Sequence, residues 1–446
     1  MMLLLPLILG LSILLLLILY FRIPAFLALL IATLVIGLVS GVPVESVLAT
    51  IQKGMGATLG YVAVVVGLGA LFGALLEKTG SARQLAQLLL EKTGQKHAPW
   101  ALMCIGFILA IPVFFDVAFI ILIPVLYALQ QKTGKSLLLF ALPLLAGLAV
   151  THAFIPPTPG PIAVAEILGA DLGWVIIAGA ATGLPAAIVS GIVFGRFIAN
   201  RIHIKAPYAA SIKQTEILKK APVSLGEILA ILLLPIILIV TKALLVAGVF
   251  GRVSPIILSV FTFLGHPFTA LILANLMAWY FLGIRSGYSK EVLYRTSMAS
   301  FAPAGTILLL TGAGGALKEM LIATSIGEQM AALWLNEQGT LFGLAFGAAV
   351  LVRVLQGSST VAMITAAGIV APLLEKGVET PLQLSLLVVS IASGASIFSH
   401  VNDSGFWLVS QYLGLTEKQT FWSWTLMTTL LALVGFAMVL LFLLFL

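Results

Sequence analysis

Residues 340–373 read TLFGLAFGAAVLVRVLQGSSTVAMITAAGIVAPL, an apolar run with polar residues at its centre. A membrane span needs about 20 apolar residues, so this run is too long and too broken for a single helix. The polar centre is Gln356-Gly-Ser-Ser-Thr360, and Arg353 lies one helical turn before it. Irregular backbone at membrane depth is tolerated only where it is buried in protein or lines a wet cavity. We therefore predict a re-entrant hairpin whose tip lies inside a membrane.

Three other apolar runs are interrupted in a similar manner. Residues 99–130 carry Asp116 between two prolines and are predicted to form a second re-entrant hairpin. Residues 137–170 and 381–415 are predicted to be broken helices, because proline removes a helix donor and glycine exposes the backbone. Their breaks are Ile155-Pro-Pro-Thr-Pro-Gly-Pro161 and Ser399-His-Val-Asn-Asp-Ser-Gly405.

The composition of the whole chain is that of a membrane protein. Of its 446 residues, 61% are hydrophobic and 9% are charged, whereas soluble domains average about 25% charged residues. A soluble enzyme, a nucleic-acid-binding protein and a disordered chain are thereby excluded. The length accommodates roughly ten to fourteen membrane segments. Strand-like alternation is absent from the sequence, so the predicted fold class is an all-α polytopic membrane protein.

The two halves of the chain match at an offset of about 245 residues, which indicates an internal duplication. Gly67-Leu-Gly69 falls on Gly312-Ala-Gly314, and Gly160 falls on Gly405. Such repeats are typical of secondary transporters. The predicted parts are a first membrane repeat, a cytoplasmic basic loop and a second membrane repeat, at residues 1–195, 196–225 and 226–446.

Lys and Arg residues set the predicted orientation, since short cytoplasmic loops are enriched in them. The loop 196–225 contains six basic residues and one acidic residue. Placing the N-terminus outside puts this loop and the other basic loops inside, if each half holds about five spans, one hairpin and one broken helix. Five is an odd number, so the second repeat is predicted to be inverted relative to the first, with both termini outside.

Ionisable residues inside the apolar runs are functional candidates, because each is costly in a membrane unless it is paired or hydrated. Arg353 is predicted to oppose the charge of an anionic substrate; the alternatives are a structural pair with an acidic neighbour or snorkelling to the interface. Asp116 lies among apolar neighbours and is too short to snorkel, so it is predicted to carry a coupled proton, with helix capping as the alternative. Asp403 is predicted to organise the site.

Hydroxyls, amides and helix starts at the breaks suit an anionic, hydroxylated ligand, because free N–H groups at a helix N-terminus attract carboxylates. The alternative for Gln356–Thr360 is helix capping alone. Histidines in the runs can change charge near neutral pH, or serve as hydrogen-bonded core residues. The predicted substrate-binding residues are Thr151, Thr158, Arg353, Gln356, Gly357, Ser358, Ser359, Thr360, Ser399, Asn402, Ser404 and Gly405. The predicted proton-coupling residues are Asp116, His152, His400 and Asp403.

Catalytic residues, metal ligands and cofactors are not predicted. The single cysteine, Cys104, has no partner for a disulfide or a metal. The glycine-rich stretches lack the lysine and hydroxyl of a phosphate-binding loop, so a nucleotide-driven pump is not expected. Trp407, Trp422 and Trp424 are interpreted as anchors at the membrane interface.

Three motifs carry a resemblance to a known family. They are Gly54-Met-Gly-Ala-Thr-Leu-Gly60, Gln356-Gly-Ser-Ser-Thr-Val-Ala362 and Ser399-His-Val-Asn-Asp-Ser-Gly-Phe-Trp407. They resemble the gluconate permease family of bacterial gluconate–proton symporters, and the resemblance runs from about residue 20 to the C-terminus. It implies a carrier of sugar acids, chiefly gluconate, whose relatives take D-serine, glycerate or other small hydroxy acids. The family looks like a branch of the ion-transporter superfamily, which implies hairpins, inverted repeats and a homodimer.

The sequence thus predicts a secondary active transporter in the bacterial inner membrane, not an enzyme. It is predicted to import gluconate, or a closely related small hydroxy acid, together with protons by alternating access. Its predicted partners are the anionic substrate, protons and the lipid bilayer, without nucleic acid. The alternatives are a membrane-embedded enzyme acting on a lipid-like substrate, a passive channel, a Na+-coupled carrier, and a carrier of D-serine or glycerate with the same fold.

Overall fold

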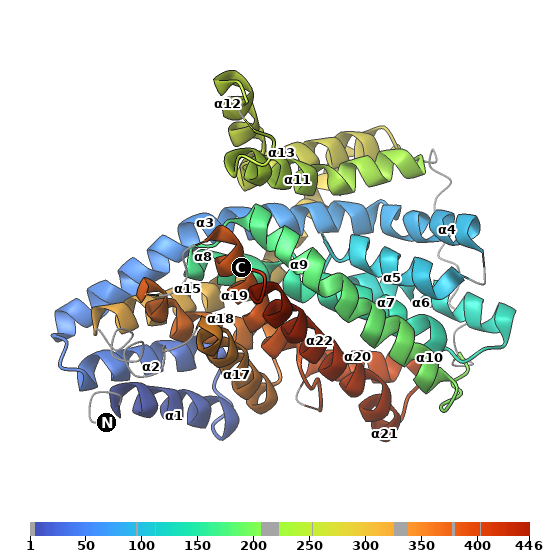
Figure 1. Cartoon of the computed structure of the whole chain (residues 1–446). Coiled ribbons are helices and arrows are strands. Elements are labelled where there is room, and N and C mark those ends of the chain that lie inside the picture. The colour runs from blue at the N-terminus through green and yellow to red at the C-terminus, as the bar shows by residue number, and fades with distance from the viewer. Residues whose placement is uncertain are drawn as a thin grey trace.

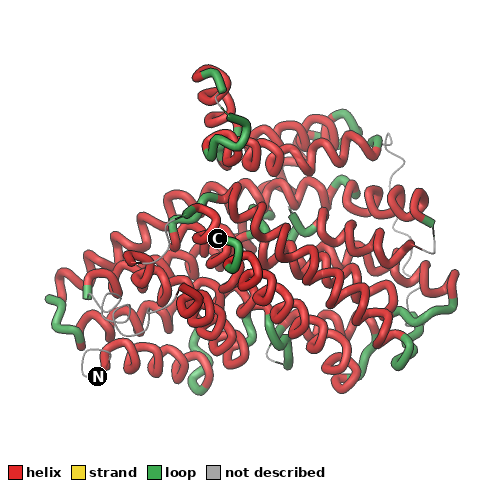
Figure 2. Tube along the Cα trace, viewed as in Figure 1, coloured by secondary structure: helices red, strands yellow, loops and turns green. Residues whose placement is uncertain are grey.

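The computed structural model describes residues 5–94, 97–111, 113–206, 223–251, 253–324, 338–376, 380–401 and 403–446, and the regular elements in these ranges are helices (Figures 1 and 2). Eight of the described helices are long and apolar enough to cross a membrane, and shorter apolar helices accompany them. The predicted all-α polytopic fold class is confirmed. Of the predicted loop 196–225, residues 207–222 fall outside the described residues, and the loop begins later than predicted because residues 196–199 are helical.

The first half of the chain contains two short apolar helices, one long helix, a helical hairpin, a broken helix and a closing helix with a π turn. These elements are α1 (Leu5–Leu19), α2 (Ala25–Val39), α3 (Val44–Lys78), α4 (Ser81–Thr93), α5 (Ala98–Leu109), α6 (Phe115–Thr133), α7 (Leu138–Phe154), α8 (Pro159–Leu168), α9 (Leu172–Ala187), η3 (Ile188–Val193) and α10 (Phe194–Ala199).

The second half also ends with a hairpin, a broken helix and a closing helix that holds a π turn. Its elements are α11 (Leu225–Val246), α12 (Pro255–Leu264), α13 (Pro267–Met277), η4 (Ala278–Ile284), α14 (Lys290–Ala299), α15 (Phe301–Ala323), α17 (Gln338–Gln356), α18 (Ser359–Val370), η5 (Ala371–Lys376), α19 (Pro381–Ser396), α20 (Ser404–Leu413), α21 (Glu417–Thr420), η6 (Phe421–Thr425) and α22 (Leu426–Leu443). This shared order supports the predicted division into two repeats, which stays a prediction.

The first hairpin consists of α5 and α6. Gly147 in α7 lies against α5, and a side chain there would collide with the carbonyl of Met103. One turn further along both helices, the hydroxyl of Thr151 donates to the carbonyl of Phe107 at 2.9 Å. The two contacts advance together, so α5 and α7 run in parallel. Since α6 lies between α5 and α7 in the chain, it brings the chain back to the end at which α5 began.

The second hairpin, α17 and α18, is held in the same way. The hydroxyl of Ser390 donates to the carbonyl of Phe342 at 2.8 Å, and a side chain at Gly394 would collide with the carbonyl of Phe346. Helices α17 and α19 therefore run in parallel, and α18 returns between them. In each half, the broken helix thus packs against the first arm of its own hairpin.

Helices α3 and α15 pack against each other, and two glycines bring their backbones into contact. Helix α3 has 35 residues, about 52 Å at 1.5 Å per residue, so it exceeds the roughly 30 Å hydrocarbon core. A Cβ at Gly54 would lie 2.5 Å from the carbonyl oxygen of Gly315, and a Cβ at Gly315 would lie 2.6 Å from that of Gly54. Close backbone approach through small residues is typical of packed membrane helices. This contact explains the first residue of the 54–60 motif.

Gly54→Val is expected to destabilise the protein, whereas Gly56→Val is expected to be tolerated. Overpacking costs about 1–3 kcal/mol, and here the obstructing atom is backbone. A Cβ at Gly56 meets no atom within 4 Å, so this variant controls for placing valine in the same helix. The measurement is the thermal unfolding midpoint of each purified variant in detergent. Equal midpoints for the two variants would contradict the packing role of Gly54.

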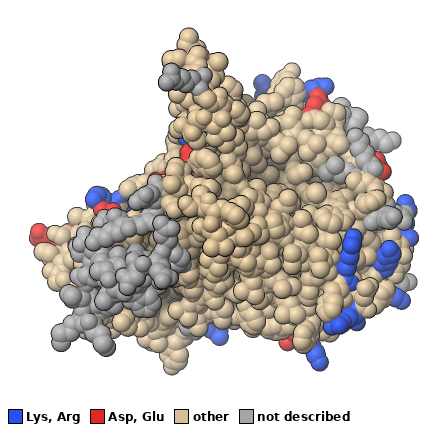
Figure 3. All heavy atoms as spheres, in the orientation of Figure 1, with Lys and Arg blue, Asp and Glu red and all other residues tan. Residues whose placement is uncertain are grey.

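On the face drawn in Figure 3, charged side chains lie toward the edges of the helical body. Figure 3 shows a group of Lys and Arg residues at the right edge, the end at which Figure 1 places α4, α6 and α10. The middle of this face is almost free of charge. Such a surface suits contact with lipid.

Candidate binding site

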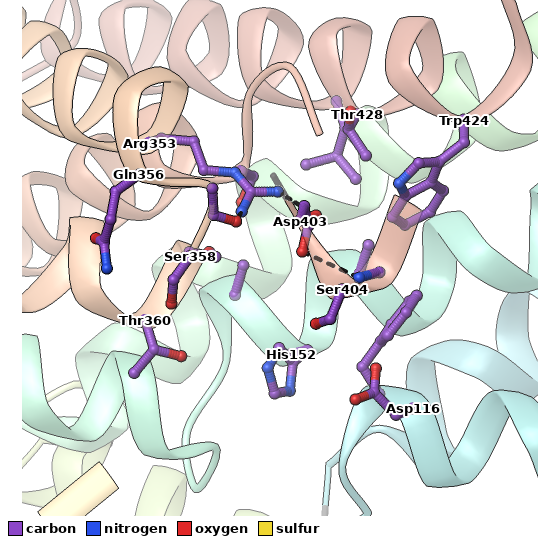
Figure 4. A pocket seen from close by; sticks show the side chains of 18 residues that line it. Asp116, His152, Arg353, Gln356, Ser358, Thr360, Asp403, Ser404, Trp424 and Thr428 are labelled. Carbon is purple, nitrogen blue, oxygen red and sulfur yellow. Dashed lines mark hydrogen bonds and ion pairs between the residues drawn. The ribbon is translucent and has the colours of Figure 1, made fainter. Parts of the chain in front are cut away.

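A cavity of about 390 Å³ lies among the breaks of the helices. Its walls come from the start of α6, from α7, from the turn between α17 and α18, from the start of α20, and from η6 and α22 (Figure 4). The cavity therefore joins the second hairpin and the second broken helix to parts of the first half. The predicted residues that line it are Asp116, His152, Arg353, Gln356, Gly357, Ser358, Ser359, Thr360, Asp403, Ser404 and Gly405.

Three helices begin at this cavity, and two of them are capped by predicted site residues. Helix α18 starts at Ser359, and the hydroxyl oxygen of its N-cap Ser358 accepts from the N–H of Val361 at 3.4 Å. Helix α20 starts after its N-cap Asp403, whose carboxylate accepts from the N–H of Gly405 at 3.0 Å. Helix α6 also starts at the cavity wall. The partial positive charge of helix N-termini favours an anion here.

Arg353 and Asp403 form an ion pair in the cavity wall (Figure 4). Nη2 of Arg353 donates to Oδ2 of Asp403 at 2.6 Å, Nε donates to the carbonyl of Ile397 at 3.3 Å, and Nη1 donates to the carbonyl of Gly357. The side chains of Arg353 and Asp403 are only 4% and 15% exposed. The guanidinium thus ties the hairpin turn to the helix break. This geometry matches the structural pair that was the alternative to a free counter-charge.

Ser399 supports the ion pair from behind the cavity. It is fully buried, and its hydroxyl donates to the carboxylate of Asp403 while accepting from Nε1 of Trp424 at 2.6 Å. Its backbone N–H donates to the hydroxyl of Thr428 at 3.2 Å. Ser399 was predicted to bind substrate, but it does not line the cavity. Its bonds instead fix the position of Asp403.

Two buried polar atoms at the cavity have no partner in the described part of the chain: Nδ1 of His152 and Oε1 of Gln356. Leaving a buried donor or acceptor unmatched costs about 1–3 kcal/mol, so a ligand that supplies the missing bonds gains that energy. The hydroxyls of Ser359, Thr360 and Ser404 line the same cavity. The site therefore offers many hydrogen bonds to a polar ligand.

Asp116 lies in the first turn of α6, and its carboxylate faces the cavity (Figure 4). The sequence placed it among apolar neighbours, and Phe115 next to it is buried. In the structure, the carboxylate of Asp116 itself lies in the wall of a polar cavity. In the described residues, Asp116 and Asp403 are the acidic side chains that line this space.

The remaining predicted residues lie elsewhere. Thr151 is buried in the contact between α5 and α7 described above. The hydroxyl of Thr158 donates to a carbonyl three residues earlier at 2.6 Å, and the residue lines a narrow neighbouring cavity. Nε2 of His400 lies 2.8 Å from the carbonyl oxygen of Val354, and the residue is not in the cavity wall. Asn402 falls outside the described residues.

The interpretation of Trp424 as an interface anchor is wrong. Its side chain is 4% exposed and lines the cavity with Thr428 and Leu431. Trp424, Thr428 and Leu431 are spaced so that they lie on one face of the helix. A threonine on that face of an apolar helix is the feature of the sequence that could have identified these cavity residues. Trp407 and Trp422 are 37% and 53% exposed, as anchors would be.

A metal site is not evident among the residues for which the structure gives positions. In those ranges, no three His, Cys, Asp or Glu side chains lie close enough together to hold a metal ion. The chemistry of the cavity is therefore that of helix N-termini, hydroxyls, one ion pair and one further carboxylate.

Sequence comparisons find relatives over nearly the whole chain. The family described as GntP family permease matches residues 2–445. The chain is 38% identical over 419 residues to the low-affinity gluconate transporter of Escherichia coli K12, covering 93% of this chain and 92% of the relative. It is 37% identical to the gluconate permease of Pseudomonas aeruginosa PAO1, covering 94% and 93%. It is 33% identical to the Gnt-II system L-idonate transporter of Escherichia coli K12, covering 96% and 95%.

The fold is similar to that of the Alcanivorax borkumensis YdaH transporter, whose crystal structure is described as having an unusual topology. The TM-score is 0.67, and the match covers 94% of this chain and 98% of the other. At 15% sequence identity, the likeness concerns the fold alone.

Proposed function

Since this chain belongs to the GntP family of permeases and is a multi-pass membrane transporter rather than an enzyme, we propose that it imports gluconate, or a closely related sugar acid, together with protons. The observation that carries the proposal is the cavity at which three helices begin and hydroxyl side chains gather. Relatives named for gluconate and L-idonate support the choice of substrate. The bacterial origin of these relatives supports an inner-membrane location.

We assign the substrate carboxylate to the starts of α18 and α20. Backbone N–H groups there carry partial positive charge, and Ser359, Thr360 and Ser404 add hydroxyl donors. Arg353 is proposed to position the binding groups and not to contact the substrate, because its guanidinium already donates to Asp403 and two carbonyls. The proposed role of Arg353 is thus to hold the two helix starts in register, and this replaces the role of direct counter-charge.

The hydroxyls of a sugar acid suit the unmatched atoms of His152 and Gln356. A site built to hydrogen-bond a hydroxyl discriminates strongly against an analogue that lacks it, because its own polar atoms are then left unpaired. The proposed site therefore favours a polyhydroxylated acid over lactate-like acids. D-serine and glycerate, with fewer hydroxyls, satisfy fewer of these groups.

Asp116 is the proposed carrier of the coupled proton, and Asp403 the proposed organiser of the site. Asp403 accepts bonds from Arg353, Ser399 and the N–H of Gly405, so it is committed to the protein. Asp116 faces the cavity beside the proposed substrate position. In alternating access, the part that bears the hairpins and broken helices moves against α3, α15 and their neighbours. The homodimer implied by the resemblance stays a prediction.

Uptake of labelled gluconate into proteoliposomes tests the proposal. Imposed pH and Na+ gradients are varied separately, with unlabelled L-idonate, D-serine and glycerate as competitors. We expect accumulation driven by an inward proton gradient and competition by L-idonate. Accumulation that follows only the Na+ gradient would show that Na+, and not H+, is the coupling ion. Equilibration without accumulation would indicate a channel.

Ser404→Ala is expected to weaken gluconate binding, with Ser410→Ala as the matched control on the same helix. A hydrogen bond to a charged ligand contributes about 1.5–3 kcal/mol, which corresponds to a roughly ten- to hundredfold change in Kd. The hydroxyl of Ser410 donates to the carbonyl of Leu415 at 2.9 Å, away from the cavity. Equilibrium binding of labelled gluconate to the purified variants measures the difference. Unchanged affinity in Ser404→Ala would contradict the proposed position of the substrate carboxylate at the start of α20.

A further inference from the structure

The substrate cavity is the first of three cavities that adjoin one another. A narrow cavity of about 20 Å³ shares His152 with it, and a larger cavity of about 310 Å³ follows. The narrow and the larger cavity share Ala70, Val113 and Phe114. The neighbouring residue Phe115 lines the substrate cavity. The three spaces therefore lie in a row along the start of α6.

One face of α3 forms a wall of both further cavities. Val66, Gly69 and Ala70 line the narrow one, and Ala70, Gly73 and Ala74 line the larger one. This spacing of three and four residues keeps the side chains on one side of the helix, and nearly all of them are small. The wall continues to Glu77 and Lys78, the last two residues of α3.

The opposite wall of the larger cavity comes from the junction of α14 and α15. Thr296, Ala299 and Ser300 line it there. Lys290 and Arg295 lie on the same short helix α14. With Lys78, they belong to the basic ends that the positive-inside rule assigns to the cytoplasm.

The segment that follows α8, the second part of the first broken helix, is held by an ion pair. Asp171 caps α9, accepting from the N–H groups of Gly173 and Trp174, and its second carboxylate oxygen pairs with Nζ of Lys242 on α11 at 3.3 Å. This ion pair joins the segment after α8 to a helix of the other half. The row of cavities, in contrast, ends beside Lys78 at the C-terminus of α3.

We propose that the cavity between α3, α6 and the α14–α15 junction is the inner vestibule of the transport route, and that the substrate leaves for the cytoplasm between Phe114 and the start of α8. This inference rests on the proposed transport function. The narrow cavity between the substrate cavity and this vestibule, about 20 Å³, holds about one water, since a water needs roughly 10–15 Å³. A sugar acid cannot pass it, so the route is closed at this point in the present state. Phe114 and Thr158–Pro159 form the two sides of the closure.

Cysteine modification tests the route. The single native cysteine is removed by Cys104→Ser, and Ala74→Cys is added in the vestibule wall. Leu71→Cys, one turn earlier on α3 and outside the walls of the three cavities, is the matched control. A charged, membrane-impermeant methanethiosulfonate is applied to inside-out and to right-side-out vesicles, and gluconate uptake is measured before and after.

We expect the reagent to reduce uptake by Ala74→Cys at least tenfold in inside-out vesicles, with no loss in right-side-out vesicles or in Leu71→Cys. Thr296→Cys on the facing wall should behave like Ala74→Cys. Uptake before modification tests the proposed function separately. If the unmodified variants carry gluconate, the inference is overturned by complete labelling without loss of uptake, by absence of labelling at both vestibule positions, or by labelling from the outer face only.

Discussion

Arg353→Met is expected to lower the free energy of unfolding by about 3–5 kcal/mol, because it leaves the largely buried carboxylate of Asp403 without its positively charged partner. The two side chains are among the least exposed charged groups described, at 4% and 15%. The carbonyls of Gly357 and Ile397 would lose their donor as well. The measurement is thermal or chemical unfolding of the purified variant. Stability equal to that of the unaltered protein would contradict a structural ion pair.

The double variant Arg353→Met/Asp403→Leu separates stability from binding. Removing both charges is often neutral for stability, since no unpaired charge remains. We expect stability to recover in part, whereas gluconate binding is lost in both the single and the double variant because the two helix starts are no longer held together. A further variant, Asp403→Asn, distinguishes the two roles of Arg353. If the guanidinium is a counter-charge for substrate, freeing it should strengthen gluconate binding; if it positions the site, binding should weaken, which we expect.

Asp116→Asn is expected to abolish uphill uptake while retaining exchange of gluconate across the membrane. With one proton per substrate, a pH difference of two units supports up to about hundredfold accumulation, since each unit is worth 1.36 kcal/mol. The amide resembles the protonated carboxyl and cannot release a proton, so the accumulation ratio should fall to about one. Counterflow of labelled against unlabelled gluconate in proteoliposomes measures the exchange that remains.

Asp171→Asn is the control for this result. Asparagine is as good an N-cap as aspartate, so α9 should keep its start although the pair with Lys242 is lost. This variant should still accumulate gluconate when a pH gradient is applied. Accumulation by Asp116→Asn would make Asp403 or a histidine the leading candidate for the coupled proton.

Much of the fold could be predicted because interruptions are conspicuous in an apolar sequence. The Gln356–Thr360 stretch and the polar residues of Ser399–Gly405 have no place in a continuous membrane helix. Both mark helix breaks in the structure, at the start of α18 and of α20. Asp403 and Ser358 act as N-caps there, so local chemistry also set the helix starts.

The partners of individual side chains could not be predicted, because they are set by packing between distant segments. Arg353 and Asp403 are 50 residues apart, and nothing local shows that they meet. His152 and His400 look alike in the sequence, yet one reaches the cavity and the other contacts the carbonyl of Val354. Trp424 resembles its exposed neighbour Trp422, and only the rotation of η6 separates their environments.

The Arg353–Asp403 pair has an electrical consequence for the proposed cycle. The proposed cycle has Asp116 ionised when the site is empty, and because the two charges of the pair cancel, the empty site then carries the charge of Asp116 alone. When the site is loaded, the anion adds one negative charge and the coupled proton removes that of Asp116, so the total is unchanged. Moving one charge through 100 mV is worth about 2.3 kcal/mol, and the loaded and empty steps move the same charge in opposite directions. In the proposed cycle with one proton per substrate, membrane voltage therefore alters the speed of single steps, while the pH difference alone sets how far substrate accumulates.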